Sequence, residues 1–245
     1  MGKLDNRVAI ITGAAGGIGY ATAEKFLEEG ASVMICDMDA VRLEEAGKTL
    51  AQKGQILWET VNICDEEAVN AMVKRTAEVF GHVDILINNA GITKDAQFYK
   101  MDIEQFRKVI DVNLMGTVVM SKAVVPYMME QKYGRIVSSS SISAVVGNFG
   151  QSNYAASKGA ISSMTRSMAR ELGKYGITVN AVLPGAIETP MTLAIPEAGR
   201  AERAARFPMR RWGQPREVAN VYAFLASEEA SYVNGAFLTV DGGYT

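Results

Sequence analysis

The sequence contains little of what several common kinds of active site require. Only two cysteines, Cys36 and Cys64, and one histidine, His82, occur among its 245 residues. Two isolated cysteines give neither a disulfide framework nor a zinc spacing, which is typical of a protein from a reducing cytosol. A single histidine excludes His-based zinc sites and Ser-His-Asp triads. We therefore expect a cytoplasmic protein without a metal site, whose two cysteines are small buried core residues.

Charge of one sign and long apolar runs are equally scarce. The formal net charge is −2, so neither nucleic acid nor an anionic membrane is expected as a main partner. Residues 1–6 are polar, and the first apolar run, residues 8–11, is too short for a signal peptide. No stretch approaches the roughly 20 apolar residues that a membrane-spanning helix needs. We expect no membrane association.

What the sequence does contain is a regular alternation of β-rich runs and helical patterns. Nearly continuous Val, Ile and Leu in the β-rich runs suit a parallel sheet that is covered on both faces. The alternation predicts an α/β fold, a single-domain Rossmann-like doubly wound parallel sheet of about seven strands with helices on both faces. No linker or repeat interrupts residues 1–245, which we interpret as one dinucleotide-binding and catalytic domain. The predicted strands are 8–12, 32–37, 55–62, 83–88, 134–139, 178–183 and 237–240, and the predicted helices are 18–29, 38–53, 66–80, 103–131, 152–174 and 215–227.

Residues 186–212 break this alternation. Pro190, Pro196 and Pro208 stand there among apolar residues such as Met191 and Ile195. The segment is long for a connection between a strand and a helix, and it follows the carboxyl end of a predicted strand, where α/β folds bind ligands. We interpret it as a substrate lid. A surface excursion or a subunit contact is the alternative.

A glycine-rich turn joins the first predicted strand to the first predicted helix. Gly13 allows a tight turn, Gly17 a close approach of the backbone to a ligand, and Gly19 close packing of helix on sheet. The helix N-terminus can then bind a pyrophosphate through its N–H groups and its dipole. The spacing Gly-x-x-x-Gly-x-Gly differs from the general dinucleotide fingerprint Gly-x-Gly-x-x-Gly, but the glycines can serve the same purposes. We predict cofactor contacts at Gly13, Gly16, Gly17, Ile18 and Gly19.

Asp37, at the end of the second predicted strand, indicates which dinucleotide is bound. A carboxylate at this place can accept hydrogen bonds from the adenosine ribose hydroxyls and would repel a 2′-phosphate. No arginine or lysine occurs in residues 12–19, and Met38 follows Asp37. These features favour NAD(H) over NADP(H). The alternative is that Asp37 caps the next helix, although Asp39 can serve there.

Three residues with characteristic spacing suggest a proton-transfer centre. Lys158 follows Tyr154 by four residues, which puts both side chains on one helical face, and Ser141 precedes Tyr154 by thirteen. A phenol has a pKa near 10, and a nearby ammonium favours the phenolate. Lowering that pKa by roughly 3 units would need about 4 kcal/mol, which a lysine and a bound cofactor cation could supply together.

Taken in order, these motifs resemble the short-chain dehydrogenase/reductase family. The similarity covers essentially the whole chain, and its residues include Asn88, Asn89, Ala90, Gly91, Asn113, Ser141, Tyr154, Lys158, Pro184, Gly185 and the run from Val240 to Gly243. The resemblance implies an oxidoreductase that interconverts a ketone and a secondary alcohol. Either of Asn88 and Asn113 alone could equally satisfy local backbone.

The resemblance also implies a role for each matching residue. Tyr154 would be the acid in reduction and the base in oxidation, and Lys158 would lower its pKa and bind the nicotinamide ribose. Ser141 would hydrogen-bond the substrate oxygen, and Asn113 would hold a water that relays protons from Lys158 to solvent. Further cofactor contacts would come from Asn62, Ile63, Asn89, Ala90, Gly91, Pro184, Gly185, Ile187 and Thr189. Asn62 stands where many relatives have an aspartate, and its amide oxygen can still accept a hydrogen bond from adenine.

Within the family, the sequence looks most like the 3-oxoacyl-(acyl-carrier-protein) reductases of fatty acid biosynthesis. That subgroup usually uses NADPH and docks its carrier protein through basic residues, whereas Asp37 favours NADH. Lys132 and Arg135 are candidates for docking an acyl carrier protein, while Tyr175 stands where a second basic residue is expected. A 3-oxoacyl thioester is therefore the expected substrate. The alternative is an NAD-dependent hydroxysteroid, polyol or other secondary-alcohol dehydrogenase.

Two further expectations rest on the resemblance. Relatives of this length commonly form homotetramers through the helices predicted at 103–131 and 152–174, although burial against the sheet would explain their apolar content equally well. A catalytically idle dinucleotide-binding protein is a third possible function. The complete set of Asn113, Ser141, Tyr154 and Lys158 disfavours it, because a pure binder needs no phenol.

Overall fold

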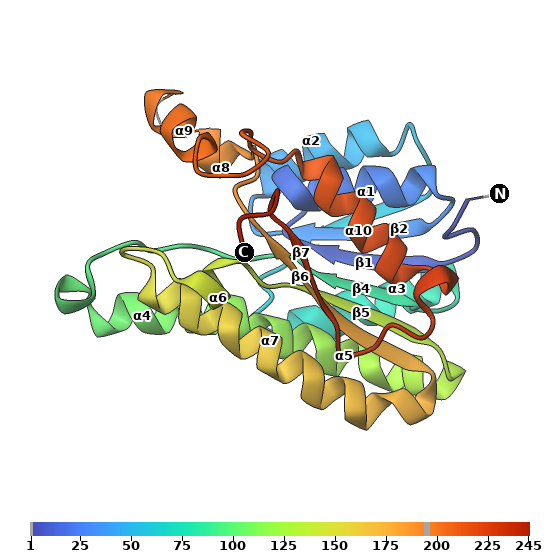
Figure 1. The fold of residues 1–245 in the computed structure, drawn as a ribbon. Coiled ribbons are helices and arrows are strands. Elements are labelled where there is room, and N and C mark those ends of the chain that lie inside the picture. The colour runs from blue at the N-terminus through green and yellow to red at the C-terminus, as the bar shows by residue number, and fades with distance from the viewer. Residues whose placement is uncertain (1, 194–196) are drawn as a thin grey trace.

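A seven-stranded parallel sheet forms the centre of the molecule in the computed structural model, which describes residues 2–193 and 197–245. The strand order is β3-β2-β1-β4-β5-β6-β7, and helices cover both faces (Figure 1). The predicted fold class is confirmed. The strands are β1 (Val8–Thr12), β2 (Ser32–Asp37), β3 (Ile56–Thr60), β4 (Ile85–Asn88), β5 (Gly134–Ser139), β6 (Ile177–Pro184) and β7 (Phe237–Val240). The longer helices are α1 (Gly17–Glu28), α2 (Ala40–Leu50), α3 (Glu66–Phe80), α4 (Ile103–Ile110), α5 (Gly116–Gln131), α7 (Ser152–Leu172) and α10 (Pro215–Ala226).

The core lies in two layers because successive residues of a strand point to opposite faces of the sheet. Ile11 and Ile35 pack on one face with Phe26 of α1, while Ile10 and Met34 pack on the other face. Every residue of β1, β5 and β6 is buried, as expected of central parallel strands. Figure 1 shows α1 and α10 on one side of the sheet and α5 and α7 on the other.

The strand order places the site. The chain runs outward from β1 through β2 to β3, and then returns to add β4 on the other side of β1. The connections that follow β1 and β4 therefore leave the sheet in opposite directions and open a crevice at the carboxyl ends of these strands. The glycine-rich turn after β1 and the segment after β4 form its two walls.

The helix predicted over residues 103–131 is not uniform. A π-helical turn, Asp111–Met115, separates α4 from α5. By length and composition alone the run Ile103–Gln131 could cross a membrane, with a mean hydropathy of 1.4 in its most apolar window. However, 44% of that window is buried within the protein, and the core helix of a globular protein has the same properties. Cys36 is buried as expected, whereas Cys64 is only half-buried.

The predicted lid contains two short helices, α8 (Pro190–Leu193) and α9 (Glu197–Ala204), while residues 194–196 of this prediction lie outside the described residues. Two contacts tie the segment to the domain. Ile187 forms an isolated bridge with Gly213, and Trp212 Nε1 donates to the carbonyl of Arg200 at 3.0 Å. The sequence patterns did not predict α6 (Ser143–Val146) or the 3₁₀ turn η1 (Phe98–Lys100), which lie on the opposite side of the cleft (Figure 1).

Candidate active site

A cavity of about 430 Å³ opens at the carboxyl edge of the sheet. The glycine-rich turn and Asp37 line one end of it, and Ser141, Tyr154 and Lys158 line the other. Every residue that the sequence predicted as a cofactor contact lines this cavity except Gly19. The structure thus brings the predicted dinucleotide contacts and the predicted proton-transfer residues into one continuous space.

The turn after β1 can exist only with glycine at two positions. Gly13 has φ of 66°, and a Cβ there would lie 2.7 Å from the Cα of Ala90. Gly19 lies under the turn, where a Cβ would stand 2.2 Å from the carbonyl oxygen of Gly13. Any larger side chain would push helix α1 away from the sheet. Gly19 is therefore a packing residue, which explains why it does not line the cavity.

The N-terminus of α1 is suited to an anion. It has no side-chain cap at Gly16 and no acidic residue in its first turn, so its N–H groups are free of competing acceptors there. Gly17, with φ of 57°, and Ile18 line the cavity beside these groups. The donor set and the space fit the pyrophosphate of a dinucleotide.

Asn89 locks the two walls of the crevice together. Its side-chain amide donates to the carbonyls of Thr12 at 3.0 Å and Gly13 at 3.1 Å. The Thr12 hydroxyl in turn accepts the backbone N–H of Asn89 at 3.1 Å and of Ala90 at 3.0 Å. The residue predicted to shape the cofactor floor therefore does so by fixing backbone and not by offering a free amide.

Asp37 holds the turn as well as facing the cavity. Its carboxylate accepts the N–H of Ala15 at 3.1 Å through one oxygen and the N–H of Asp39 at 3.1 Å through the other. The capping role belongs to Asp39, which accepts the N–H of Arg42 at 3.1 Å. Asp37 is therefore not the cap of α2, and its contact with the adenosine ribose stays a prediction.

Arg42 is the residue that the sequence reasoning missed. It lies in the first turn of α2 and lines the adenosine end of the cavity. Its guanidinium lies so close to Gly16 that a Cβ on that glycine would be 2.9 Å from Nη2. A cation five residues beyond Asp37 was visible in the sequence, but only the fold brings it against the glycine-rich turn.

The adenine end has an exposed polar rim. Asn62 lines the cavity, and its side-chain oxygen accepts the N–H of Cys64 at 3.1 Å. An amide oxygen has a second lone pair, so the predicted adenine contact fits this geometry. Asp65 caps α3 by accepting two backbone N–H groups, as its sequence position predicted.

Lys158 is buried close to Tyr154, the tyrosine of the predicted proton-transfer centre. Its Nζ donates to the carbonyl of Ser139 at 2.6 Å and lies 5.6 Å from the centroid of the Tyr154 ring. Burial lowers the pKa of this ammonium from 10.5 to about 8. Lys158 is therefore the group in this site that changes charge closest to neutral pH.

The phenol of Tyr154 is subject to opposing influences. Burial raises its pKa most, a hydrogen bond with the Ser141 hydroxyl lowers it, and the negative charge of Asp95 raises it further. Ser141 is the member of the serine run that reaches the phenol. The side chain of Ser138 pairs with Asn88, and that of Ser140 donates to the carbonyl of Lys158 at 2.9 Å.

A chain of hydrogen bonds supports the Ser141 hydroxyl. The backbone N–H of Ser143 donates to Ser141 Oγ at 3.1 Å, which leaves the hydroxyl proton of Ser141 for the phenol or a substrate. Asn148 donates to the Ser143 hydroxyl at 2.8 Å and to Gln151 Oε1 at 3.1 Å. Gln151 then donates to Asp95 at 2.9 Å. Asn148 therefore joins the loop that carries Ser141 to the start of α7.

Asn113 is buried within the π-helical turn and does not line the cavity. Its amide accepts the N–H of Ile92 at 2.8 Å and donates to the Ile92 carbonyl at 3.0 Å and to Ser157 at 3.0 Å. A Cβ on Gly91 would contact both Asn113 Oδ1 and Lys158 Nζ, so the two groups flank one glycine. The water relay stays a prediction.

The nicotinamide end of the cavity is formed by the segment after β6. Pro184, Gly185, Ile187 and Thr189 line it as the sequence predicted, joined by Thr192. Gly185 fits tightly against the C-terminal segment, because a Cβ there would lie 2.9 Å from the Cα of Asp241. The matching run near the C-terminus thus supports this wall of the site.

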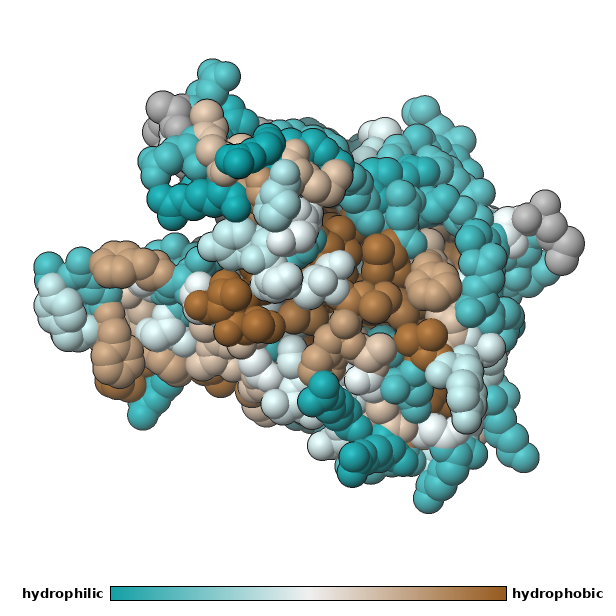
Figure 2. Space-filling view, viewed as in Figure 1, coloured by the Kyte–Doolittle hydropathy of each residue, from teal (hydrophilic) through white to brown (hydrophobic). Residues whose placement is uncertain are grey.

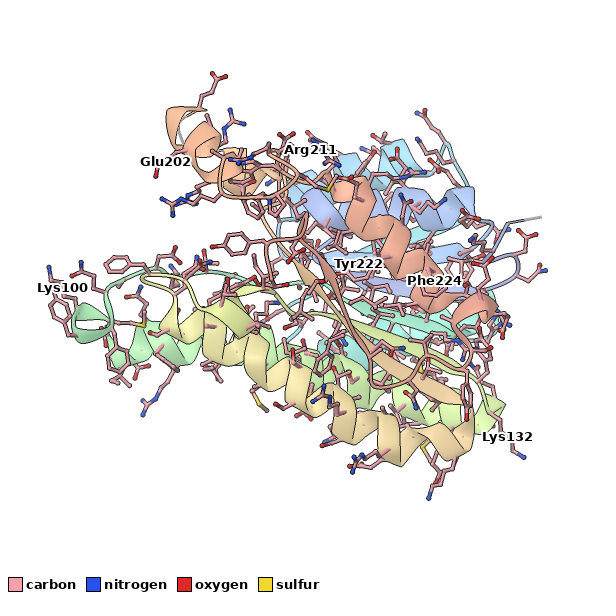
Figure 3. The ribbon with its side chains drawn as sticks, viewed as in Figure 1. Lys100, Lys132, Glu202, Arg211, Tyr222 and Phe224 are labelled. Atoms are coloured by element: carbon pink, nitrogen blue, oxygen red, sulfur yellow. The ribbon has the colours of Figure 1, made fainter. Side chains whose placement is uncertain are left out.

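Lys132 and Arg135, the candidates for docking a carrier protein, lie away from the cavity of their own chain, and the docking stays a prediction. Lys132 caps the C-terminus of α5 just before β5 begins, so it lies at the amino edge of the sheet, far from the lid (Figure 3). Arg135 is buried, pairs with Glu228 at 3.2 Å and stacks on the ring of Tyr133. Both residues belong to the end of the molecule opposite the cavity.

Comparisons with known proteins agree with this geometry. A family model described as "Enoyl-(Acyl carrier protein) reductase" matches residues 13–245. A 3-oxoacyl-[acyl-carrier-protein] reductase, FabG, of Thermotoga maritima is 44% identical over 98% of both chains. The (2S)-[(R)-hydroxy(phenyl)methyl]succinyl-CoA dehydrogenase subunit BbsD of Thauera aromatica is 41% identical over 98% of this chain and 97% of its own. The crystal structure of levodione reductase superposes with a TM-score of 0.93 at 36% identity, over 98% of each chain.

The relatives are named reductases and dehydrogenases, and the matches cover nearly the full length of each protein. The chain belongs to the short-chain dehydrogenase/reductase family, whose members are NAD(P)-dependent oxidoreductases acting on secondary alcohols and ketones.

Proposed function

We propose that the protein is an NAD(H)-dependent reductase of 3-oxoacyl thioesters, with the acyl group on coenzyme A or an acyl carrier protein. One observation carries the proposal. Tyr154, Lys158 and Ser141 line the same cavity as the glycine-rich turn and Asp37, which supports a site where the phenol meets a bound dinucleotide. The identity to a 3-oxoacyl-[acyl-carrier-protein] reductase supports the substrate class.

In this proposal the protein orients the substrate and moves a proton. When bound, the dinucleotide supplies the hydride to the carbonyl carbon or takes it from the alcohol. Tyr154 donates its phenolic proton to the carbonyl oxygen in reduction and accepts it back in oxidation. Ser141, whose proton is left free by the Ser143 N–H, hydrogen-bonds the same oxygen. Asn113 is assigned the role of holding the water that relays protons from Lys158 to solvent.

Lys158 is assigned the role of lowering the phenol's pKa and binding the nicotinamide ribose. The protein raises the pKa of Tyr154 by burial, so the phenol favours its protonated form, as a proton donor should. As the proton leaves, negative charge develops on a phenol whose ring centroid lies 5.6 Å from the Nζ of Lys158, which is protonated below about pH 8. That charge stabilises the phenolate when it is needed.

The preference for NAD(H) rests on Asp37. Its carboxylate is fixed by two backbone N–H groups at the adenosine end, where a 2′-phosphate would meet its charge. Arg42, against Gly16, is the group that would weaken this preference. A comparison of kcat/KM for NADH and NADPH tests the assignment, and a preference for NADPH would contradict it.

The second candidate is a dehydrogenase of a hydroxysteroid, a polyol or another secondary alcohol. The likeness to levodione reductase, whose name implies no thioester, favours it.

A non-catalytic binder is the weakest candidate because a pure binder needs no phenol in its cavity. A homotetramer and a cytoplasmic location complete the proposal, and sedimentation velocity would test the first.

A substrate panel separates the candidates. We expect the fastest NADH oxidation with acetoacetyl thioesters, compared with a steroid ketone, a cyclic diketone and the ketose forms of sugar alcohols at equal concentration. The Tyr154→Phe variant is the control for each. A higher kcat/KM for a steroid or a cyclic ketone would replace the thioester assignment with the second candidate.

A further inference from the structure

The outer part of the lid is basic although the protein is acidic. Residues 197–211 contain five arginines and two glutamates, a net charge of +3, in a chain whose formal net charge is −2. The arginines are Arg200, Arg203, Arg206, Arg210 and Arg211, and we call them the lid arginines. Such a concentration of one charge on a short segment attracts anions from solution.

Among the described residues, two of the lid arginines form ion pairs with acidic side chains. Arg206 pairs with Glu202 at 2.6 Å, and Arg211 binds Glu217 through two hydrogen bonds of 2.7 and 2.8 Å. In the described part of the chain, Arg200, Arg203 and Arg210 have no ion-pair partner. Arg203 and Arg210 are also exposed, so their charges face solvent.

Helix α9, which carries Arg200 and Arg203, lies in the same lobe as α8, whose residues line the cavity (Figure 1). Pro190 and Thr192 of α8 line the cavity itself, and Figure 1 shows α9 farther out in this lobe. Figure 3 shows the lobe with Glu202 overhanging a notch, with the lobe that carries Lys100 on the other side. In Figure 2 hydrophilic residues dominate the upper lobe, whereas apolar residues stand among hydrophilic ones on the lower lobe.

The apolar side of the notch is made of side chains that protrude into solvent. Phe98 and Tyr99 of η1 are 75% and 78% exposed, and Phe149, after α6, is 88% exposed. A ligand that enters between the lobes therefore meets aromatic surface on one side and uncompensated positive charge on the other. An apolar acyl chain with an anionic carrier has this pair of properties.

We propose that Arg203 and Arg210 bind the phosphates of coenzyme A, which would make the preferred substrate an acyl-CoA. This step rests on the proposed function. With the ketone at Tyr154, the pantetheine arm would run outward along the notch, and the phosphate-bearing end would emerge beside α9. A protein carrier commonly buries about 800 Å² per partner, whereas one eight-residue helix and its following turn offer a surface suited to a small polyanion.

The kinetic test compares acetoacetyl-CoA with acetoacetyl-N-acetylcysteamine, which has the same ketone and thioester and no phosphate. The double variant Arg203→Ala/Arg210→Ala should lower kcat/KM for the CoA substrate about tenfold, mainly through KM, and leave the truncated substrate within about twofold. The control Lys74→Ala/Arg75→Ala removes the same charge from helix α3, outside the cavity lining, and should change neither value. Raising the salt concentration should weaken the CoA preference of the unmodified protein and not that of the lid variant.

A binding measurement separates this inference from the proposed function. Isothermal titration calorimetry measures the binding of free coenzyme A to the protein without any turnover. The protein is first saturated with NAD⁺, so that coenzyme A cannot enter the dinucleotide site. We expect the lid variant to bind coenzyme A about tenfold more weakly than the control variant does. Equal affinity would overturn the inference, even if thioesters are reduced.

Two other outcomes would also overturn it. An equal loss with both thioesters would mean that the arginines only hold the lid in shape. A larger loss with an acyl-carrier-protein substrate than with acetoacetyl-CoA would assign the surface to a protein. Conversely, if no thioester is reduced but coenzyme A binding still depends on the two arginines, the proposed function fails and the anion site stands.

Discussion

The cofactor half of the cleft and the substrate half are built in different ways. Around the glycine-rich turn, short side chains such as Thr12, Asn89 and Asp37 hold neighbouring backbone groups in place, and the ligand would meet mostly main chain. Around the notch, the exposed residues are long or aromatic, such as Phe149 and Arg203, and few contacts fix them. The first half is specified by local geometry, and the second can change its side chains without disturbing the fold.

The largest expected effect lies where the two halves meet. Tyr154→Phe removes the transferable proton and keeps the ring, so turnover should fall by about 10³-fold or more while NADH binding stays within about twofold. Steady-state rates and a fluorescence titration with NADH measure the two quantities. If the variant lost NADH affinity to the same degree, the tyrosine would belong to the cofactor half alone.

The next effect tests the cofactor half. Asp37→Ala removes the charge that a 2′-phosphate would meet, so kcat/KM with NADPH should rise about tenfold relative to NADH. Arg42→Ala in the same background should reverse part of that gain. Among the described residues that line the cavity, Arg42 and Lys158 are the two cations, and Arg42 is the one at the adenosine end. Unchanged cofactor selectivity in Asp37→Ala would contradict the role given to this carboxylate.

The sequence predicted most of the residues that line the cofactor half of the cavity, and this has a physical reason. Gly13, Gly17 and Asp37 act through backbone conformation and strand position, which a local pattern records. The same holds for Tyr154 and Lys158, whose spacing on one helix fixes their relation.

The contributions that depend on distant segments were not predicted. Arg42 approaches Gly16 only because α2 packs beside the turn, and the π-helical turn at Asn113 accompanies hydrogen bonds to Ile92, 21 residues away. Lys132 precedes β5 and so lies at the amino edge of the sheet, away from the cavity of its own chain. That signal was present in the sequence.

A smaller effect tests the substrate half. Asn148 is a positioning residue, since it touches neither Tyr154 nor Lys158 but joins Ser143 to Gln151. Asn148→Ala should lower kcat about three- to tenfold by loosening Ser141, with KM for NADH unchanged. The exposed Asn70 of α3 provides a matched control, Asn70→Ala. A fall in NADH affinity equal to the fall in kcat would show that the loop supports the cofactor half instead.

The smallest effect concerns how Lys158, which lies where the two halves of the cleft meet, changes the stability of the fold with pH. The pKa of Lys158 is about 8 in the folded protein, below its ordinary 10.5, so between these values the unfolded chain binds more protons. The unfolding free energy should therefore rise with pH in this window, by up to about 1.4 kcal/mol per pH unit. Chemical denaturation of the unmodified protein and Lys158→Met at pH 7.5 and 9.5 measures it. The unfolding free energy of the unmodified protein, relative to that of Lys158→Met, should be greater at pH 9.5 than at pH 7.5. An equal difference at the two pH values would refute the lowered pKa of Lys158.

The central claim is that one cavity joins a dinucleotide to a ketone at Tyr154. The most direct measurement uses NADH deuterated at both C4 positions and acetoacetyl-N-acetylcysteamine, with the product analysed by mass spectrometry. We expect a 3-hydroxybutyryl thioester with one deuterium on carbon 3, formed by the unmodified protein and not by Tyr154→Phe. An unlabelled product, or labelled product at equal rates from both proteins, would contradict it.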